Sequence, residues 1–367
     1  MKILHTADIH LREYEDNRWR ALQRLIEIGK QEKVEIFVIS GDLFDKGINA
    51  ETLRPKIREI FSNNGFKIIL IPGNHDSKSY KNGMYFGEDT IILTNLDEPF
   101  EYKDLMIWGL PFEPIEGEEI LKKLSLLANN SATDKRNILL YHGEFLDAFF
   151  SRKDFGEEGE GRYMPVKPSY FEDLNIDYVL AGHFHSKFDM WKLENGGYFV
   201  YPGSPISITK REIGQRKVNL FEVGKPPNEY LLDTPHFENV VIEFDPFIQE
   251  NPIEIVKEHI EKVHSEASII LTIRGYINSE EAKIGETEVV KQIREITQGK
   301  SVVEEHYEFK DIYTILDDDL FKSFIEKLEQ SDHDGEKKKQ LRDMAIKAMV
   351  NHPRLKRLSR NQKYYGK

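Results

Sequence analysis

The sequence of 367 residues contains no cysteine, which excludes disulfide bonds and thiolate metal ligands. Any bound metal must therefore be held by oxygen and by imidazole nitrogen. No apolar run approaches the ~18 residues that a membrane-spanning helix needs, so we expect no membrane segment. The charged start Met1-Lys2 leads directly into a strand pattern and not into a signal peptide, which favours a cytoplasmic location.

Basic residues are also outnumbered: 51 Lys and Arg stand against 64 Asp and Glu, which gives a net charge of -13. The segment Glu336–Lys367 is the exception, with 11 basic and 2 acidic residues and a charge of +9, which leaves -22 for residues 1–335. Phosphate contacts need local positive charge, so the acidic body argues against nucleic-acid binding by bulk attraction. Bound divalent cations would reverse the sign of the charge locally.

The chain is longer than most single domains, and its first half alternates strand-like and helical patterns. Such βαβ units predict a parallel sheet that is covered on both faces. The expected strands are Lys2–Thr6, Val34–Ser40, Lys67–Ile71, Asp104–Gly109, Asn137–Tyr141 and Ile176–Ala181, and the expected helices are Asn17–Lys30, Ala50–Ser62 and Ile115–Ala128. We expect a second sheet, packed on the first, from the antiparallel run Phe188–Leu193, Gly197–Tyr201, Lys217–Val223 and Glu229–Asp233.

Three domains are expected, because turn residues near residue 235 end the main domain, 1–235. Residues 236–315 show a compact βαβαβ pattern, and residues 316–367 form a helical, basic region. Its helix at 337–350 carries an apolar stripe formed by Leu341, Met344, Ala345, Ala348 and Met349. Core packing and docking onto a partner both predict such a stripe. We favour docking, because the helix follows a polar linker and belongs to the basic tail.

Residue types that bind metals follow five of the strand-like runs. The five segments are Asp8-Ile9-His10, Gly41-Asp42-Leu43-Phe44-Asp45, Gly73-Asn74-His75-Asp76, Tyr141-His142-Gly143 and Gly182-His183-Phe184-His185. In extended backbone, residues two apart point to the same side, so pairs such as Asp8 with His10 can bind at one site. Ligands collect at the carboxyl ends of strands in open α/β sheets. The two aspartates, one asparagine and four histidines therefore predict a site for two divalent metals, with Asp42 free to bridge both and His75 left for proton transfer.

The order of these motifs resembles the calcineurin-like metallophosphoesterase superfamily, whose pattern is D-x-H, G-D-x-x-D, G-N-H-[DE], a lone H and G-H-x-H. The resemblance covers residues 1–235 and implies an α/β fold, a two-sheet αββα sandwich. It also implies that His75 is the catalytic histidine and that Asp45 is its partner. The implied ligands of one metal are Asp8, His10, Asp42 and His185, and those of the other are Asp42, Asn74, His142 and His183. The implied metal is manganese, although iron, zinc or magnesium suits the same nitrogen and oxygen donors.

Finer features resemble the SbcD type of DNA-repair nuclease. They are the opening Lys2–His10, the Gly41-Asp42-Leu43-Phe44 variant, Gly143-Glu144-Phe145 and the appended βαβαβ module. This resemblance implies a homodimer that acts on DNA as a 3′-to-5′ exonuclease and single-strand endonuclease. It also implies that the βαβαβ module caps the site and binds DNA, and that the C-terminal helices bind an SbcC-type coiled-coil ATPase. Two alternatives are a phosphoesterase for nucleotides or phosphoproteins and a scaffold that bridges DNA ends and cleaves little.

The other polar candidates have simpler interpretations. His5 lies in a strand, where we expect it to be a core residue or to support the ligands rather than to bind metal. Asp76 is interpreted as a helix cap or a loop brace. The histidines without ligand spacing are expected to be ordinary surface or core residues: His236, His259, His264, His306, His333 and His352.

Overall fold

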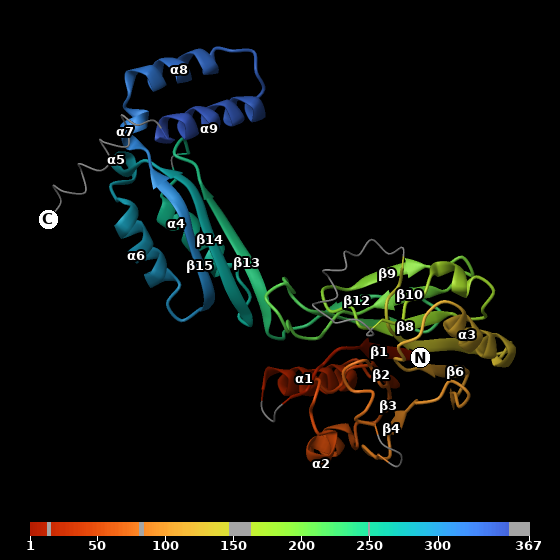
Figure 1. Cartoon of the computed structure of the whole chain (residues 1–367). Helices are drawn as coiled ribbons and strands as arrows, with labels where there is room; N and C mark the ends of the chain where they lie inside the picture. Colours follow the sequence, from red (N-terminus) through yellow and green to blue (C-terminus); the bar gives the residue numbers. More distant parts are fainter. Residues whose placement is uncertain (13–15, 81–83, 147–162, 249, 352–367) are drawn as a thin grey trace. The chain divides into compact units, whose positions relative to one another are not determined.

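The computed structural model describes residues 1–12, 16–80, 84–146, 163–248 and 250–351 (Figure 1). The chain divides into two compact units, Met1–Phe237 and Glu238–Lys367. Among the described residues, none of the helices combines the length and the apolar character needed to cross a bilayer.

The first unit begins with a six-stranded sheet in the order β12-β11-β1-β2-β3-β4. Its parallel part consists of β1 (Lys2–Thr6), β2 (Ile36–Ser40), β3 (Lys67–Ile71) and β4 (Thr90–Ile92), joined through α1 (Asn17–Gln31) and α2 (Ala50–Phe61). The strands β11 (Lys217–Glu222) and β12 (Glu229–Leu231) extend it in antiparallel fashion. Helix α1 begins where the Asp16 side chain accepts hydrogen bonds from the backbone N–H groups of Arg18 and Trp19. The predicted helix and strand periodicities are confirmed here.

The second sheet has the order β5-β6-β7-β8-β10-β9. Its strands are β5 (Phe100–Tyr102), β6 (Leu105–Leu110), β7 (Arg136–His142), β8 (Tyr178–Gly182), β10 (Tyr198–Tyr201) and β9 (Asp189–Lys192), with α3 (Glu118–Asn130) and the 3₁₀-helix η2 (Pro168–Phe171) between them. The strands β6, β7, β8 and β10 are parallel neighbours.

The expectation that the strands after residue 188 form a sheet of their own is therefore wrong. Strands β9 and β10 join β8 in the second sheet, whereas β11 pairs with β1 in the first. Period-two patterning identifies a strand and its buried face, but it does not select the neighbouring strand.

The first unit has three apolar layers, and alternate residues of each strand point into different layers. Ile3 and Val38 from the first sheet meet Leu140 and Leu180 from the second in the layer between the sheets. Helices α1 and α2 pack on the outer face of the first sheet, and the α3 side chains join the core on the outer face of the second. The predicted two-sheet αββα sandwich is thus confirmed.

The second unit contains a three-stranded sheet in the order β13-β14-β15 (Figure 1). Along the chain it runs β13 (His236–Phe244), α4 (Pro252–Glu261), β14 (Ala267–Ile277), α5 (Ser279–Ala282), α6 (Glu286–Ile296) and β15 (Ser301–Asp311). Helices α4 and α6 pack on one face through Val256 and Ile293, which contact the core around Ile273. On the other face Arg274 is exposed, and its guanidinium lies 3.1 Å from the carboxylate of Glu243.

Three helices follow, α7 (Tyr313–Leu316), α8 (Asp319–Glu329) and α9 (Gly335–Asn351). They share a small core in which Phe321 and Ile346 are buried. The predicted stripe on α9 divides: Ala345 and Met349 pack against this core, whereas Met344 is 66% exposed. Residues 352–367, which include His352 and the basic end of the predicted tail, lie outside the described residues.

Candidate metal centre

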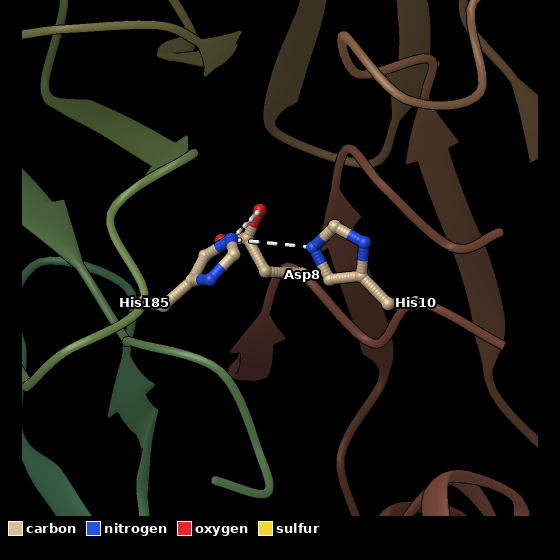
Figure 2. A group of neighbouring side chains, drawn as sticks. All are labelled: Asp8, His10 and His185. Atoms are coloured by element: carbon tan, nitrogen blue, oxygen red, sulfur yellow. Dashed lines mark hydrogen bonds and ion pairs between the residues drawn. The ribbon is translucent and has the colours of Figure 1, made fainter. Parts of the chain in front are cut away.

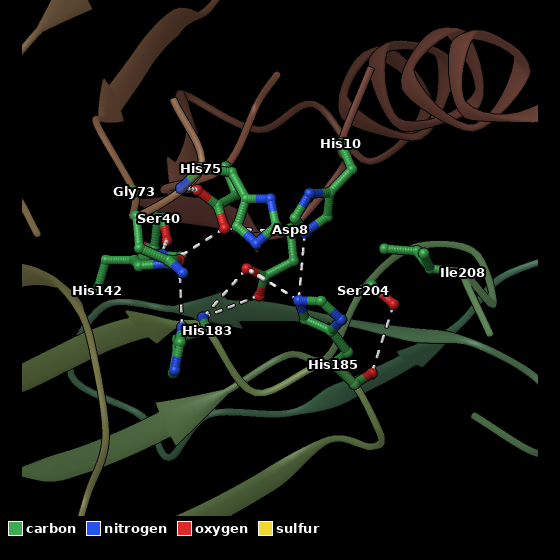
Figure 3. Close-up of polar contacts among 12 residues, drawn as sticks. Asp8, His10, Ser40, Gly73, His75, His142, His183, His185, Ser204 and Ile208 are labelled. Carbon is green, nitrogen blue, oxygen red and sulfur yellow. Dashed lines mark hydrogen bonds and ion pairs between the residues drawn. The ribbon is translucent and has the colours of Figure 1, made fainter. Parts of the chain in front are cut away.

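All seven predicted ligands meet in the first unit, together with His75 and Asp45. Figure 2 shows Asp8, His10 and His185, and Figure 3 adds His75, His142 and His183. They come from the carboxyl ends of strands in both sheets. The segments after β1, β2 and β3 supply Asp8, His10, Asp42 and Asn74, whereas β7 and the segment after β8 supply His142, His183 and His185. The site therefore lies where the strand ends of the two packed sheets converge.

The backbone is unusual at four of these residues. Asp8, His10, Asp42 and His183 have φ values of 56°, 53°, 51° and 99°, in the left-handed region that L-residues other than glycine rarely adopt. Hydrogen bonds to neighbouring loops hold them there, including His10 N–H to the Asp42 carbonyl at 2.9 Å. Such conformations cost of order 1–3 kcal/mol each and persist where the surrounding structure over-determines them, as at functional sites.

Two motif glycines permit the close approach of these loops. A Cβ at Gly73 would overlap the carboxylate of Asp42, and a Cβ at Gly41 would overlap the ring of His142. Gly41 also has a φ of 93°. Both motifs therefore need glycine for packing around the ligands as well as for the turn.

One group of donors consists of Asp8, His10 and His185 (Figure 2). The Nε2 atoms of His10 and His185 lie 3.2 Å apart, and His185 Nε2 lies 3.6 Å from Asp8 Oδ1. The backbone N–H of His183 donates to Asp8 Oδ2 at 2.9 Å and fixes the carboxylate. These donor atoms lie within 4.8 Å of one another, close enough to share one cation.

A second group of donors surrounds the side-chain carbonyl of Asn74. His142 Nε2 lies 2.9 Å from Asn74 Oδ1, and His183 Nδ1 lies 3.3 Å from the same oxygen. His142 Nε2 also lies 3.4 Å from Asp42 Oδ2, which in turn lies 3.8 Å from His10 Nε2. Asp42 thus stands between the two groups.

The buried carboxylate of Asp42 tests whether these residues suit a metal. Its Oδ2 atom is inaccessible to solvent and has no hydrogen-bond partner among the described residues, although imidazole nitrogens of His10 and His142 face it. A buried carboxylate oxygen in this state is costly unless a cation neutralises it. Nitrogen and oxygen donors without sulfur suit Mn²⁺, Fe²⁺, Zn²⁺ or Mg²⁺, so the residues fit a divalent metal.

Proton equilibria within the cluster support the same reading. Burial raises the pKa of Asp42. The neighbouring His142 and His10 lower it by more than burial raises it, so the pKa of Asp42 lies below its ordinary value. Burial lowers the pKa of His142, whereas Asp42 raises it more strongly, to about 9. Without metal the cluster therefore holds protons, which metal binding at these nitrogens would release.

His75 and Asp45 form a third group at the edge of the centre. His75 Nδ1 lies 3.2 Å from Asp45 Oδ1, and the His75 backbone N–H donates to Asp42 Oδ1 at 2.9 Å. The guanidinium of Arg12 donates to the other Asp45 oxygen. Burial raises the pKa of Asp45, but hydrogen bonds from His10 and His75 bring it well below its usual range. Arg12 stands two residues after His10 of the first motif, yet no spacing rule singled it out.

Buried polar residues behind the ligands hold the loops in place. Asp76 accepts hydrogen bonds from the N–H groups of Gly73 at 2.7 Å and Phe44 at 3.1 Å, and from the Tyr80 hydroxyl at 3.0 Å. Its interpretation as a loop brace is confirmed. Burial, together with the charge of Asp42, raises the pKa of Asp76 to about 7. His5 is fully buried in β1, as expected of a core residue, and burial lowers its pKa to about 3.

Sequence reasoning assigned no role to three further buried residues. Glu144 Oε1 lies 3.0 Å from His183 Nε2, and Glu212 Oε1 lies 3.6 Å from His185 Nδ1. Arg216 donates to the backbone carbonyls of His185, Ser186 and Ser204. Glu144 stands two residues after His142, so its position was a usable signal. Glu212 and Arg216 lie in a later loop, where nothing in the local pattern marks them.

Two packed sheets that gather aspartate, asparagine and histidine donors at their strand ends define a metal-dependent hydrolase. The particular family follows from the sequence: residues 1–187, half of the chain, match the calcineurin-like phosphoesterase family, and the chain belongs to that family.

Two curated relatives are named DNA double-strand break repair protein Mre11. The protein from Saccharolobus solfataricus is 26% identical over 235 residues, and the one from Sulfurisphaera tokodaii is 28% identical over 235 residues. Each alignment covers 58% of this chain and 56% of the relative, so the chain spans little more than half of their length. Among solved structures, a dimetal phosphatase from Danio rerio is 10% identical, with a TM-score of 0.40 over 60% of this chain and 91% of that one.

Proposed function

We propose that this chain is the nuclease subunit of a DNA-repair system, a phosphodiester hydrolase that works with two divalent ions. The observation that supports the proposal most directly is the position of the buried Asp42 carboxylate between two groups of donors. Its Oδ2 atom has no hydrogen-bond partner among the described residues. Membership of the phosphoesterase family supports the reaction class. The names of the Mre11 relatives support DNA ends as the substrate.

The assignment of ligands follows the two groups of donors. Asp8, His10, Asp42 and His185 would hold one ion, and Asp42, Asn74, His142 and His183 would hold the other. We propose manganese for both. When bound, two such ions supply a hydroxide nucleophile near neutral pH and neutralise charge on the phosphoryl group.

His75 would protonate the oxygen that leaves the phosphorus atom. Its Nδ1 faces Asp45 at 3.2 Å, and Nε2 is the ring nitrogen that would carry a proton toward the substrate. Asp45 would fix the ring orientation, and Arg12 would in turn hold Asp45. General acid catalysis of this kind contributes typically ~10²–10⁴-fold to the rate.

The second unit and the chain's partners complete the proposal. The βαβαβ module, residues 236–315, would cap the site and bind DNA, and two copies of the chain would form a homodimer. An SbcC-type ATPase would bind the helices after residue 316 through exposed apolar side chains such as Leu320, at 75% exposure, and Met344. Met344→Glu should therefore weaken co-purification with that ATPase while Ile346, which is buried, keeps the helix in place. Unchanged co-purification would remove α9 from the docking surface.

The function is tested by incubating the purified, metal-free chain with a linear DNA duplex and a single-stranded DNA circle. Added Mn²⁺ should release nucleotides from the 3′ ends of the duplex and open the circle, and His75→Ala should do neither. Bis-p-nitrophenyl phosphate serves as the control substrate. Cleavage of this small diester without cleavage of either DNA would favour a phosphoesterase for other substrates, and cleavage of none would favour a scaffold.

A further inference from the structure

The two histidines of the last motif present opposite ring nitrogens to the metal centre. His183 turns Nδ1 inward, where it lies 3.3 Å from Asn74 Oδ1. His185 turns Nε2 inward, where it lies 3.2 Å from His10 Nε2 and 3.6 Å from Asp8 Oδ1. A neutral imidazole offers a lone pair on one nitrogen only, so the two rings need opposite tautomers to bind metal.

Each outward nitrogen faces a different buried glutamate. His183 Nε2 lies 3.0 Å from Glu144 Oε1, and His185 Nδ1 lies 3.6 Å from Glu212 Oε1. Both glutamates are 4% exposed, so water does not compete freely for these contacts. A carboxylate next to a ring nitrogen favours the proton on that nitrogen and leaves the lone pair on the other.

Backbone N–H groups fix both carboxylates from behind. Glu144 Oε2 accepts a hydrogen bond from the N–H of Met164 at 2.7 Å. Glu212 Oε2 accepts one from the N–H of Ile208 at 2.6 Å, and its Oε1 accepts from the Thr209 hydroxyl at 3.2 Å. A backbone N–H can only donate, so each anchored oxygen is held as an acceptor.

We propose that Glu144 and Glu212 are positioning residues, each of which sets the tautomer of one metal-binding histidine and thereby supports one of the two metals. The inference rests on the proposed two-metal function. Glu144 acts through His183 on the ion near Asn74, and Glu212 acts through His185 on the ion near Asp8. The two metal positions are therefore separable by changes outside the ligand set.

Glutamine provides the sharpest substitution at both positions, because it preserves the size of the side chain. In Glu144→Gln the amide oxygen is retained by the Met164 N–H, which turns the NH₂ group toward His183 Nε2. That nitrogen must then accept, so the proton moves to Nδ1 and blocks the inward lone pair. The same reasoning applies to Glu212→Gln, with Ile208 as the anchor. Glu229→Gln, at an exposed ion pair with Lys217, is the matched control.

Calorimetric titration of the metal-free proteins with Mn²⁺ tests the inference. Wild type and Glu229→Gln should bind two ions, and each site variant should bind one of them ~10–100-fold more weakly. The double variant should bind both ions weakly, because each glutamate supports a different site. A single variant that binds both ions with wild-type affinity would overturn the inference, as would a double variant that keeps one site intact. If wild type itself binds only one ion, the two-metal function fails instead.

A second measurement needs no variant. In the wild-type protein loaded with Zn²⁺, which is diamagnetic, the ¹⁵N chemical shifts of the rings report which nitrogen carries the proton. The proton should be on Nε2 of His183 and on Nδ1 of His185. The opposite tautomer at either ring would overturn the assignment of its glutamate, whatever the fold stability of the glutamine variants.

Discussion

The two units of the chain cover their sheets differently. In the first unit, helices pack outside both sheets, and the sheets bury their inner faces against each other. In the second unit, helices α4 and α6 cover one face of the three-stranded sheet, and side chains such as Arg274 and Glu243 are exposed on the other. The first arrangement can fix many side chains from all directions, whereas the second leaves a charged surface open to solvent.

The two units also differ in how many non-glycine residues adopt left-handed backbone conformations. Four metal-site residues of the first unit adopt left-handed φ angles. Among the described residues of the second unit, Lys283 at the C-terminus of α5 is the one non-glycine residue with a positive φ. Strained, charged clusters need surrounding layers that over-determine them, and the first unit supplies such layers around its metal-site residues.

The largest expected effect is the loss of metal and activity in Asp42→Ala. Asp42 stands between both groups of donors, so its removal should empty at least one metal position and abolish phosphodiester cleavage. Elemental analysis after gel filtration measures the metal content. Glu258→Ala, at an exposed carboxylate on α4, is the control in the second unit and should retain both metals. Full metal content in Asp42→Ala would place the ions elsewhere.

The next effect separates metal binding from proton transfer within the first unit. His75→Ala should keep its metals and lose ~10²–10⁴-fold in cleavage rate, because His75 faces Asp45 and lies outside both groups of ligands. Asp45→Asn should show a smaller loss, since the ring remains but its orientation is less fixed. Rates on bis-p-nitrophenyl phosphate and metal analysis of the same samples measure both. A wild-type rate in His75→Ala would make this residue structural.

Core truncation compares the stability of the two units. Ile273→Ala should lower the free energy of unfolding of the second unit by about 2–5 kcal/mol, because the Ile273 side chain on β14 is fully buried in the core that the sheet shares with α4 and α6. Ile107→Ala, at a fully buried site between the two sheets, is the matched change in the first unit. Urea unfolding and metal binding are measured together. We expect the Ile273 variant to keep full metal affinity, and a loss of metal there would mean that the units fold as one.

The last effect concerns the pH dependence of stability in the first unit, and it is absent at neutral pH. Burial lowers the pKa of His5 from 6.5 to about 3, so the folded state binds its proton less readily than the unfolded state. The contribution of His5 to stability is therefore complete above pH 6.5 and is lost as the pH falls toward 3. The slope should be about 1.4 kcal/mol per pH unit in that window. In His5→Gln this part of the slope should vanish, as measured by urea unfolding of metal-free protein at a series of pH values. Equal slopes in wild type and the variant would contradict the role of His5.

Local patterns predicted what is local in this molecule. Each motif sits at the end of one strand, so the positions of Asp42, Asn74 and His183 at strand ends followed from short stretches of sequence. The pairing of β11 with β1 could not be predicted in this way, because the sequence pattern of a strand does not determine which strand lies next to it. Glu212 reaches His185 from a separate loop, and its role depends on that tertiary approach. On α9, Ile346 turned inward and split the predicted stripe, since the packing of α7 and α8 decides which side is covered.

The pairing of β11 with β1 has a consequence for biosynthesis. Strand β1 is translated before the other strands of its sheet, and one of its two neighbours in the sheet, β11, is made last among the long strands of the first unit. The donors His10 and His185 are 175 residues apart. At ~5–20 residues per second, roughly 10–35 s pass between the synthesis of the first histidine and that of the last. The early ligands therefore remain an incomplete set until His185 has been made, and four strands of the two sheets, β9 to β12, are translated only after that.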